Sequence, residues 1–157
     1  MPNDFQTIDH YLPHRRGMLL VDRLLAADEE GATCELTVRD GLFAHEDGVP
    51  AWVGIEYMAQ TVATWAGAGH ARRGTRQRPG FLLGSRRYTA HVGAFALGTR
   101  LRVTVRCELL GDNGLGMFDC RIQDADTEAL LAQARVSVYE QAEGKDTDLL
   151  ALLQTGA

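Results

Sequence analysis

Lysine is almost absent from this sequence of 157 residues, which has one lysine, Lys145, and 15 arginines. Proline is also sparse, with four residues, and neither an internal repeat nor a low-complexity tract is present. Because 45% of the residues are hydrophobic and 24% are charged, the composition excludes collagen-like and disordered classes. A chain of this length can bury one core, so we expect one domain over residues 1–157.

The N-terminus lacks the apolar run of a secretory signal, because residues 1–10 are polar and no small-residue cleavage site follows them. We therefore expect a cytoplasmic protein. Cysteines are few as well, and Cys34, Cys107 and Cys120 lie far apart, without the paired spacing of a zinc or redox site. Buried thiols in a reducing compartment are the simpler interpretation, and we expect no metal.

Acidic residues outnumber basic ones, which gives a net charge of −5 and argues against nucleic-acid binding. Residues 71–90 are the exception: this basic window has six arginines and no acidic residue, so it carries +6 and leaves −11 for the rest of the chain. It could attract an acidic macromolecule, or it could be a solvated loop in a chain that uses arginine in place of lysine. Its arginines are Arg72, Arg73, Arg76, Arg78, Arg86 and Arg87.

Alternating apolar and polar residues predict a sheet built from hairpins. An apolar run over residues 18–28 and an alternating run over 32–39 indicate the first hairpin. The tail, residues 141–157, is expected to add a short helix or to fray. Further strands are expected over 80–91, 100–110, 116–123 and 129–140, with turns at 112–114 and 124–126.

One long segment, from Pro50 to about His70, is apolar on nearly all sides and rich in alanine and glycine. Proline suits the first position of a helix. A helix that is apolar all round is buried in protein or in membrane, and Glu56, Gln60 and the scattered glycines disfavour a membrane span. The sequence therefore predicts an α+β fold in which an antiparallel sheet wraps around a long central helix.

Glu56 is the only formally charged residue between Ala51 and Gly69. Burial among apolar groups favours the protonated form of a carboxyl, which suits a general acid. Gln60 lies four residues further on, on the same face of the helix, so it can hydrogen-bond to this carboxyl and orient it. The alternative is a helix with one solvent-exposed face, on which both side chains are solvated.

His45 lies in the loop before this helix, where an imidazole can be aimed across the helix N-terminus. The free N–H groups of a helix start can polarise a thioester carbonyl, and a histidine beside it can remove the α proton. Glu56 could then protonate a departing β-hydroxyl. Taken alone, a loop histidine is more simply interpreted as a surface or capping residue. We interpret His70 and His91, which lack comparable neighbours, as structural or surface residues.

Two motifs carry a resemblance to a known family. Residues 12–23, LPHRRGMLLVDR, resemble the opening of the FabZ-like 3-hydroxyacyl-acyl carrier protein dehydratases, and residues 56–60, EYMAQ, resemble their central-helix Glu-x-Met-Ala-Gln. Looser similarity extends through residues 81–84 and the later strands. Within the family, the short ApeP-like dehydratases of aryl-polyene and xanthomonadin-type pathways are the most similar.

The resemblance implies a hotdog fold and the dehydration of a 3-hydroxyacyl thioester on acyl carrier protein to the trans-2-enoyl thioester, in fatty-acid or polyene-type biosynthesis. It implies no cofactor other than the phosphopantetheine thioester that the carrier protein supplies. It also implies a homodimer or higher hotdog oligomer, in which His45 is the base and Glu56 of the neighbouring subunit is the acid. His14 is implied to be structural.

The resemblance further implies a substrate tunnel beside the central helix, with carrier-protein docking on the basic window. Gln60, Trp52 and Met58 become candidates for substrate positioning, although Trp52 and Met58, taken singly, are more simply interpreted as core residues. The candidates for docking are Arg72, Arg73, Arg86 and Arg87.

The loop of His45 departs from the family pattern. Ala44 replaces the usual glycine and Glu46-Asp47 replaces Phe-Pro. The path from His45 to Pro50 is also about three residues shorter, enough to move an imidazole by several ångströms. A non-catalytic or weakly active subunit that partners another dehydratase therefore stays an alternative. A hotdog acyl thioesterase, in which Glu56 would activate water, is a second alternative, and both motifs argue against it.

Overall fold

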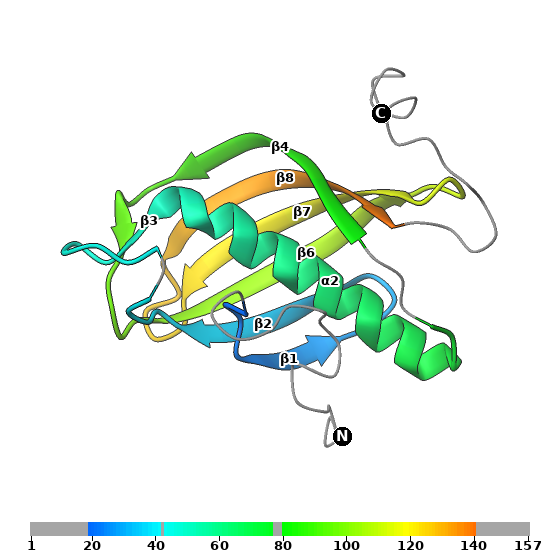
Figure 1. Cartoon of the computed structure of the whole chain (residues 1–157), viewed down its shortest axis with the longest axis horizontal. Coiled ribbons are helices and arrows are strands. Elements are labelled where there is room, and N and C mark those ends of the chain that lie inside the picture. The colour runs from blue at the N-terminus through cyan, green and yellow to red at the C-terminus, as the bar shows by residue number, and fades with distance from the viewer. Residues whose placement is uncertain (1–18, 42, 77–79, 141–157) are drawn as a thin grey trace.

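The computed structural model describes residues 19–41, 43–76 and 80–140. They form one long helix and two antiparallel sheets (Figure 1). The larger sheet contains β1 (Arg23–Ala27), β2 (Gly31–Thr37), β4 (Gly80–Ala90), β6 (Arg100–Leu110), β7 (Leu115–Asp124) and β8 (Leu130–Glu140). The smaller sheet contains β3 (Val49–Pro50) and β5 (Ala94–Phe95), and the 3₁₀-helix η2 (Ala51–Val53) leads into α2 (Gly54–Arg73).

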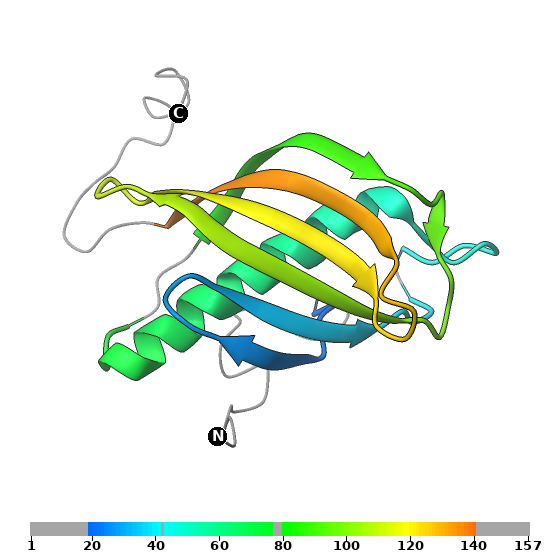
Figure 2. The ribbon, with the colours of Figure 1, turned by 180° about the vertical axis from the view of Figure 1, so that it is seen from behind.

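The larger sheet has the strand order β1-β2-β6-β7-β8-β4, with every neighbouring pair antiparallel. Figures 1 and 2 show this sheet curved around α2, so that the helix lies along its concave face. The strands β6, β7 and β8 follow one another as a meander, whereas β4 lies at the edge beside β8. The predicted antiparallel sheet around a central helix is confirmed.

The sheet and the helix share one core because apolar residues alternate along the strands. In β6, Leu101, Val103 and Val105 are fully buried, and the residues between them are partly exposed. Met58 and Val62 of α2 belong to the same buried cluster. Burying one such side chain stabilises the fold by about 1.5–3 kcal/mol, so these facing rows hold the helix against the sheet.

The three cysteines are free thiols, of which Cys34 and Cys120 are buried and Cys107 is partly exposed. Burial raises the pKa of the Cys34 thiol to about 12, although hydrogen bonds with Thr61 and Thr64 act in the opposite direction. Burial also raises the pKa of Cys120. A thiol that stays protonated is a poor nucleophile and a poor metal ligand, which agrees with the interpretation of Cys34 and Cys120 as structural residues.

The central helix differs from the prediction at both ends. It begins at Gly54 after a 3₁₀ turn, whereas Pro50 pairs with Ala94 in the smaller sheet. At the other end it continues three residues past His70 and is followed by Gly74, whose φ of 67° is the left-handed conformation that glycine adopts at low cost. Within the described ranges, no helix is both long enough and apolar enough to cross a bilayer.

His70 has neighbours that the sequence did not reveal. Its Nε2 lies 2.7 Å from Glu140 Oε1 at the end of β8, and its Nδ1 lies 2.7 Å from Thr75 Oγ1. These contacts join the last turn of α2 to β8, which agrees with a structural role. The predictions for the tail (141–157), for His14 and for Arg78 lie outside the described residues.

Candidate active site

Glu56 and Gln60 lie one turn apart on α2 and are joined by a hydrogen bond. Gln60 Nε2 donates to Glu56 Oε1 at 3.1 Å, as the spacing of four residues predicts. Glu56 is half-buried in the first turn of α2, whereas the Gln60 side chain is fully buried. The alternative of two solvated side chains is therefore wrong for Gln60.

The other end of the Gln60 amide holds the segment that leads to β1. Its Oε1 accepts hydrogen bonds from the backbone N–H groups of Leu20 at 2.8 Å and Val21 at 3.3 Å. Because the oxygen is used there, the NH₂ group is the end that faces Glu56. Gln60 thus joins the two sequence motifs, 12–23 and 56–60. The sequence could not reveal this contact, because Leu20 and Val21 lie 40 and 39 positions before Gln60 in the chain.

Replacing Gln60 with leucine is expected to lower the free energy of unfolding by about 1–3 kcal/mol, because the buried N–H of Val21 loses its acceptor. Urea denaturation of the two proteins measures the difference. Gln133→Leu is the matched control, since Gln133 is a half-buried glutamine of β8, and it is expected to change stability by less than about 0.5 kcal/mol. Equal effects of the two substitutions would contradict the role of Gln60 as an acceptor.

A cavity of about 470 Å³ lies between the residues before β1, the end of β2 and the first turns of α2. Its apolar lining includes Leu20, Phe43 and Val53. Its polar lining includes Asp22 and Arg39, which form an ion pair. The volume is within the range of small-molecule sites, so the cavity can hold part of an acyl group.

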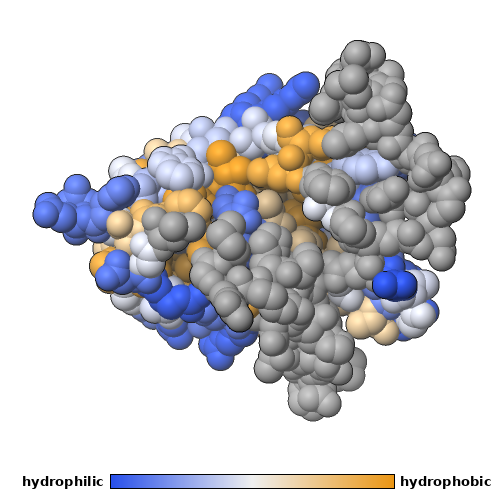
Figure 3. Space-filling model, in the orientation of Figure 1, coloured by the Kyte–Doolittle hydropathy of each residue, from blue (hydrophilic) through white to orange (hydrophobic). Residues whose placement is uncertain are grey.

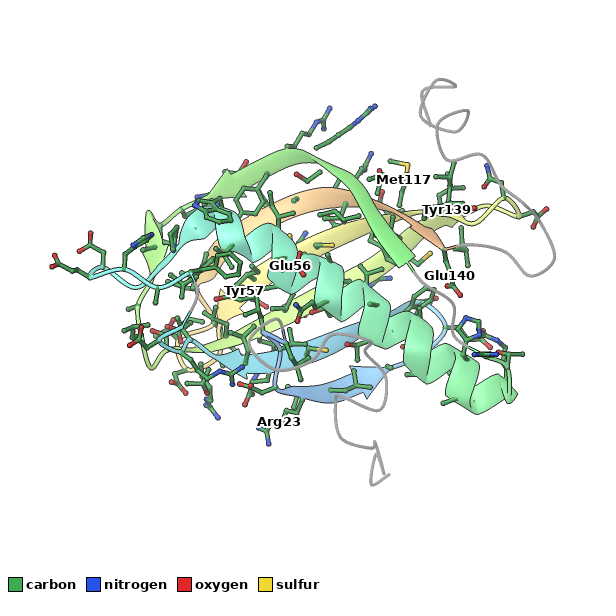
Figure 4. The ribbon with its side chains drawn as sticks, in the orientation of Figure 1. Arg23, Glu56, Tyr57, Met117, Tyr139 and Glu140 are labelled. Carbon is green, nitrogen blue, oxygen red and sulfur yellow. The ribbon has the colours of Figure 1, made fainter. Side chains whose placement is uncertain are left out.

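Tyr57 lines this cavity from α2 and is the neighbour of Glu56 on the helix (Figure 4). The residue is 2% exposed, and its ring packs against Phe95 with the centroids 5.7 Å apart. Burial raises the pKa of Tyr57 to about 12, while Arg39 acts in the opposite direction. The phenol therefore keeps its proton near neutral pH and can donate a hydrogen bond. No sequence pattern indicated Tyr57, which occupies the variable position of its motif.

His45 occupies the first position of a tight turn with Glu46 and Asp47 at its tip. The His45 N–H donates to the Gly48 carbonyl at 2.8 Å, and the Gly48 N–H donates back at 3.0 Å. Figure 1 shows this loop projecting beside the N-terminal end of α2. The His45 side chain is exposed, and within the described residues no hydrogen bond or ion pair joins it to Glu56 of the same chain. The predicted base and acid are therefore not paired within the described part of one chain.

Some backbone N–H groups at the start of α2 already have acceptors, unlike those at the N-terminus of a simple helix. Because η2 runs directly into α2, the Gly54 N–H already points at the carbonyls of Ala51 and Trp52. The Ala51 N–H donates to the carbonyl of Gly93 at 3.1 Å. The first N–H groups of a helical segment have no partner inside it. In η2 the carbonyl of the N-cap residue Pro50 accepts the first bond of the turn, from Val53, so the N–H of Trp52 is the donor of this turn that can face a ligand.

Trp52 and Met58 lie in different environments. Trp52 is 60% exposed and meets the ring of Phe43 edge-on, with the centroids 5.7 Å apart. The interpretation of Trp52 as a core residue is therefore wrong. Met58 is fully buried in the core. Since Phe43 also lines the cavity, the exposed Trp52 lies where it can contact a ligand or a partner at the cavity edge.

The fold divides the basic window into two groups. Arg72 and Arg73 are exposed at the C-terminal end of α2, whereas Arg86 and Arg87 are exposed in the middle of β4. Figures 1 and 2 place the end of α2 and the middle of β4 on different sides of the molecule. None of the four forms an ion pair with an acidic side chain of the described residues. The expected single docking surface is thus two separate surfaces.

Comparison with known proteins gives matches over most of the chain. A family model described as ApeP-like, ApeP dehydratase, matches residues 6–151. The 3-hydroxyacyl-[acyl-carrier-protein] dehydratase FabZ of Psychrobacter arcticus is 27% identical over 153 residues, which cover 90% of this chain and 100% of that protein.

Solved structures agree with these matches. A chain of the dehydratase heterocomplex ApeI:P from Xenorhabdus doucetiae is 31% identical, with a TM-score of 0.80 and coverage of 95% of this chain and 98% of that one. Zebrafish thioesterase superfamily member 2, at 17% identity, a TM-score of 0.62 and coverage of 83% and 88%, shares the fold alone. The predicted hotdog fold is confirmed. The chain belongs to the ApeP-like dehydratase family.

Proposed function

We propose that this protein removes water from a 3-hydroxyacyl thioester on acyl carrier protein and forms the trans-2-enoyl thioester, in fatty-acid or polyene-type biosynthesis. Family membership supports dehydration. The observation that carries the proposal is the half-buried Glu56, held by the buried Gln60 amide. The reaction transfers protons and no electrons to an acceptor, so it needs no cofactor beyond the substrate's phosphopantetheine.

In this proposal the imidazole of His45 removes a proton from the α carbon. The N–H group of Trp52 polarises the thioester carbonyl, which stabilises the negative charge that develops on its oxygen. The electron pair of the broken C–H bond forms the double bond, the β C–O bond breaks, and Glu56 gives its proton to the departing hydroxyl. The cavity lined by Tyr57 holds part of the acyl group.

We infer that two hotdog chains complete each site, since no hydrogen bond or ion pair joins His45 and Glu56 within the described part of one chain. Figure 3 shows an apolar area beside α2 and over β4, and Leu82 of β4 is 40% exposed. A second chain packed there would bury apolar surface and bring its own His45 loop to Glu56. The second chain is either another copy or a different hotdog dehydratase, as the heterocomplex of ApeI:P illustrates for its own subunits.

We further propose that the carrier protein docks at Arg86 and Arg87. Reversing both to glutamate is expected to raise KM for a carrier-bound substrate by about tenfold or more at low salt, because like charges repel an acidic partner. The effect is expected to shrink in about 0.5 M salt, which screens charges over a few ångströms. Steady-state assays with carrier-bound and carrier-free thioesters measure it.

The control for docking reverses Arg106 and Arg121, whose side chains are 69% and 59% exposed, and thus makes the same change in net charge elsewhere. This pair is expected to change KM far less than the Arg86 and Arg87 pair. Equal increases in KM for both pairs would show that only net charge matters, and would contradict docking on β4.

Mass-spectrometric detection of water loss from a 3-hydroxyacyl-acyl carrier protein tests the function. Formation of the enoyl thioester is the expected result. Release of the free acid would instead indicate the thioesterase. No reaction, with carrier protein still bound, would favour a subunit that partners another dehydratase, and activity on adding that partner would establish it.

A further inference from the structure

Tyr88 of β4 reaches the turn that precedes α2. Its hydroxyl donates a hydrogen bond to the carbonyl of Ala51. Gly54 lies so close that a Cβ at this position would overlap the same hydroxyl. Since the Ala51 N–H donates to Gly93 at 3.1 Å, Ala51 is held at both of its backbone groups by the end of β4 and the residues that follow it.

The carbonyl of Ala51 and the N–H of Trp52 belong to the same peptide group, which is planar and trans. A hydrogen bond that fixes the direction of the carbonyl therefore also fixes the N–H, which points the opposite way. The bond also polarises the peptide and strengthens the N–H as a donor. Burial raises the pKa of Tyr88 to about 12, so its hydroxyl keeps the proton that this bond requires.

We propose that Tyr88 is a positioning residue that aims the Trp52 N–H at the carbonyl oxygen of the thioester. The inference rests on the proposed function, in which that N–H stabilises the developing negative charge. Tyr88 itself does not touch the substrate. It acts through the Ala51–Trp52 peptide, and its contribution is to the rate of the chemical step.

A β-bulge brings Tyr88 to this position. Pairing between β4 and β8 steps from Arg86 opposite Arg135 to Thr89 opposite Gln133. β4 therefore has one more residue than β8 across this interval. Bulges of this kind occur at sheet edges and beside active sites, where they redirect a side chain, and β4 is an edge strand.

The extra residue changes which side chains of β4 face the core. Before the bulge Leu83 and Ser85 are partly buried, and after it Tyr88 and Ala90 are partly buried. Unbroken alternation would place Arg87 inside and Tyr88 outside, because successive side chains point to opposite faces. Arg87 has a φ of 55°, the left-handed conformation that residues other than glycine rarely adopt. This one residue thus leaves Arg87 exposed and points Tyr88 inward.

Tyr88→Phe removes only the hydroxyl. With 3-hydroxybutyryl-N-acetylcysteamine as a carrier-free probe, we expect kcat to fall by about 10- to 100-fold, with KM within about twofold, because the reacting groups are misplaced by a fraction of an ångström. Tyr139→Phe removes another tyrosine hydroxyl, at the far end of the sheet (Figure 4), and is expected to keep wild-type kcat. A Tyr88→Phe protein with wild-type kcat would overturn the proposal.

Arg87→Gly and Arg87→Val test the bulge. Both remove the guanidinium, so they share any effect on docking. Glycine adopts a positive φ readily, whereas a β-branched residue does not. We expect the kcat of Arg87→Val to be about tenfold below that of Arg87→Gly. Valine would disturb the bulge, and with it the hydrogen bond from Tyr88 to the Ala51 carbonyl. Equal kcat values would show that the bulge does not position Tyr88.

Failure of the proposed function is recognised separately, because wild-type protein would then not turn over the probe. The structural part of the inference is tested without activity by the NMR signal of the Trp52 amide. We expect Tyr88→Phe to shift this signal and to speed its hydrogen exchange, whereas Tyr139→Phe does neither. An unchanged Trp52 signal in Tyr88→Phe would overturn the proposal even for an inactive protein.

Discussion

Replacing Glu56 with glutamine is expected to lower kcat for dehydration by about 10²- to 10⁴-fold, the usual contribution of a general acid. The amide has the same size as the carboxyl, and its oxygen can still accept the hydrogen bond from Gln60 Nε2. The new side chain has no proton that it can give to the departing hydroxyl. Because binding of the substrate does not need that proton, KM is expected to change little.

Steady-state formation of the enoyl thioester measures this effect, with circular dichroism to show that the fold is retained. Glu108→Gln is the control, since Glu108 is an exposed glutamate of β6 that pairs with Arg135 at 3.0 Å. It is expected to keep wild-type kcat. If Glu56→Gln kept more than about a tenth of wild-type kcat, Glu56 would not be the acid.

Those parts of the fold that depend on a local repeating pattern were predictable. The strand expected over residues 100–110 has these bounds in the structure, because Leu101, Val103 and Val105 alternate without interruption. The contact between Glu56 and Gln60 was predictable for the same reason, since residues four apart share one face of a helix.

Features that interrupt the alternation of apolar and polar residues could not be predicted. β4 contains an extra residue at the Arg87 bulge, so the alternation that identifies the strand assigns Tyr88 to the wrong face. The strand of Val49–Pro50 is too short to alternate. The residues Arg86, Arg87 and Tyr88 contain no sign of a bulge, because arginine rarely adopts the positive φ that Arg87 has.

The position of His45 was not predictable either, because it depends on the path of a loop. Gly48 has a φ of 110°, which lets the chain close the tight turn that carries His45. The sequence predicted the residue types of a base and an acid, but the distance between them depends on this turn and, under the proposed function, on a second chain. The roles of His45 and Glu56 therefore need a test that shows whether the two residues act within one chain or across two chains.

Mixing His45→Ala with Glu56→Gln is expected to restore about a quarter of wild-type activity, although each variant is inactive alone. In a mixed dimer, one site combines the wild-type His45 of one chain with the wild-type Glu56 of the other. The second site carries both substitutions. Random exchange of subunits gives half of the dimers this composition, and each of them has one working site of two.

The reverse experiment separates a shared site from a site within one chain. A mixed dimer of wild type and the double variant, His45→Ala with Glu56→Gln, leaves every shared site with one substitution, so it is expected to be inactive. If the two residues acted within one chain, this dimer would keep about half of wild-type activity, and the first mixture would stay inactive. Purification through two different tags isolates the mixed dimers for both measurements, and the isolated dimer of the first mixture is then expected to have about half of wild-type activity, because one of its two sites works. The two mixtures thus have opposite outcomes under the two arrangements, and activity in the first alone would assign His45 and Glu56 to one site built from two chains.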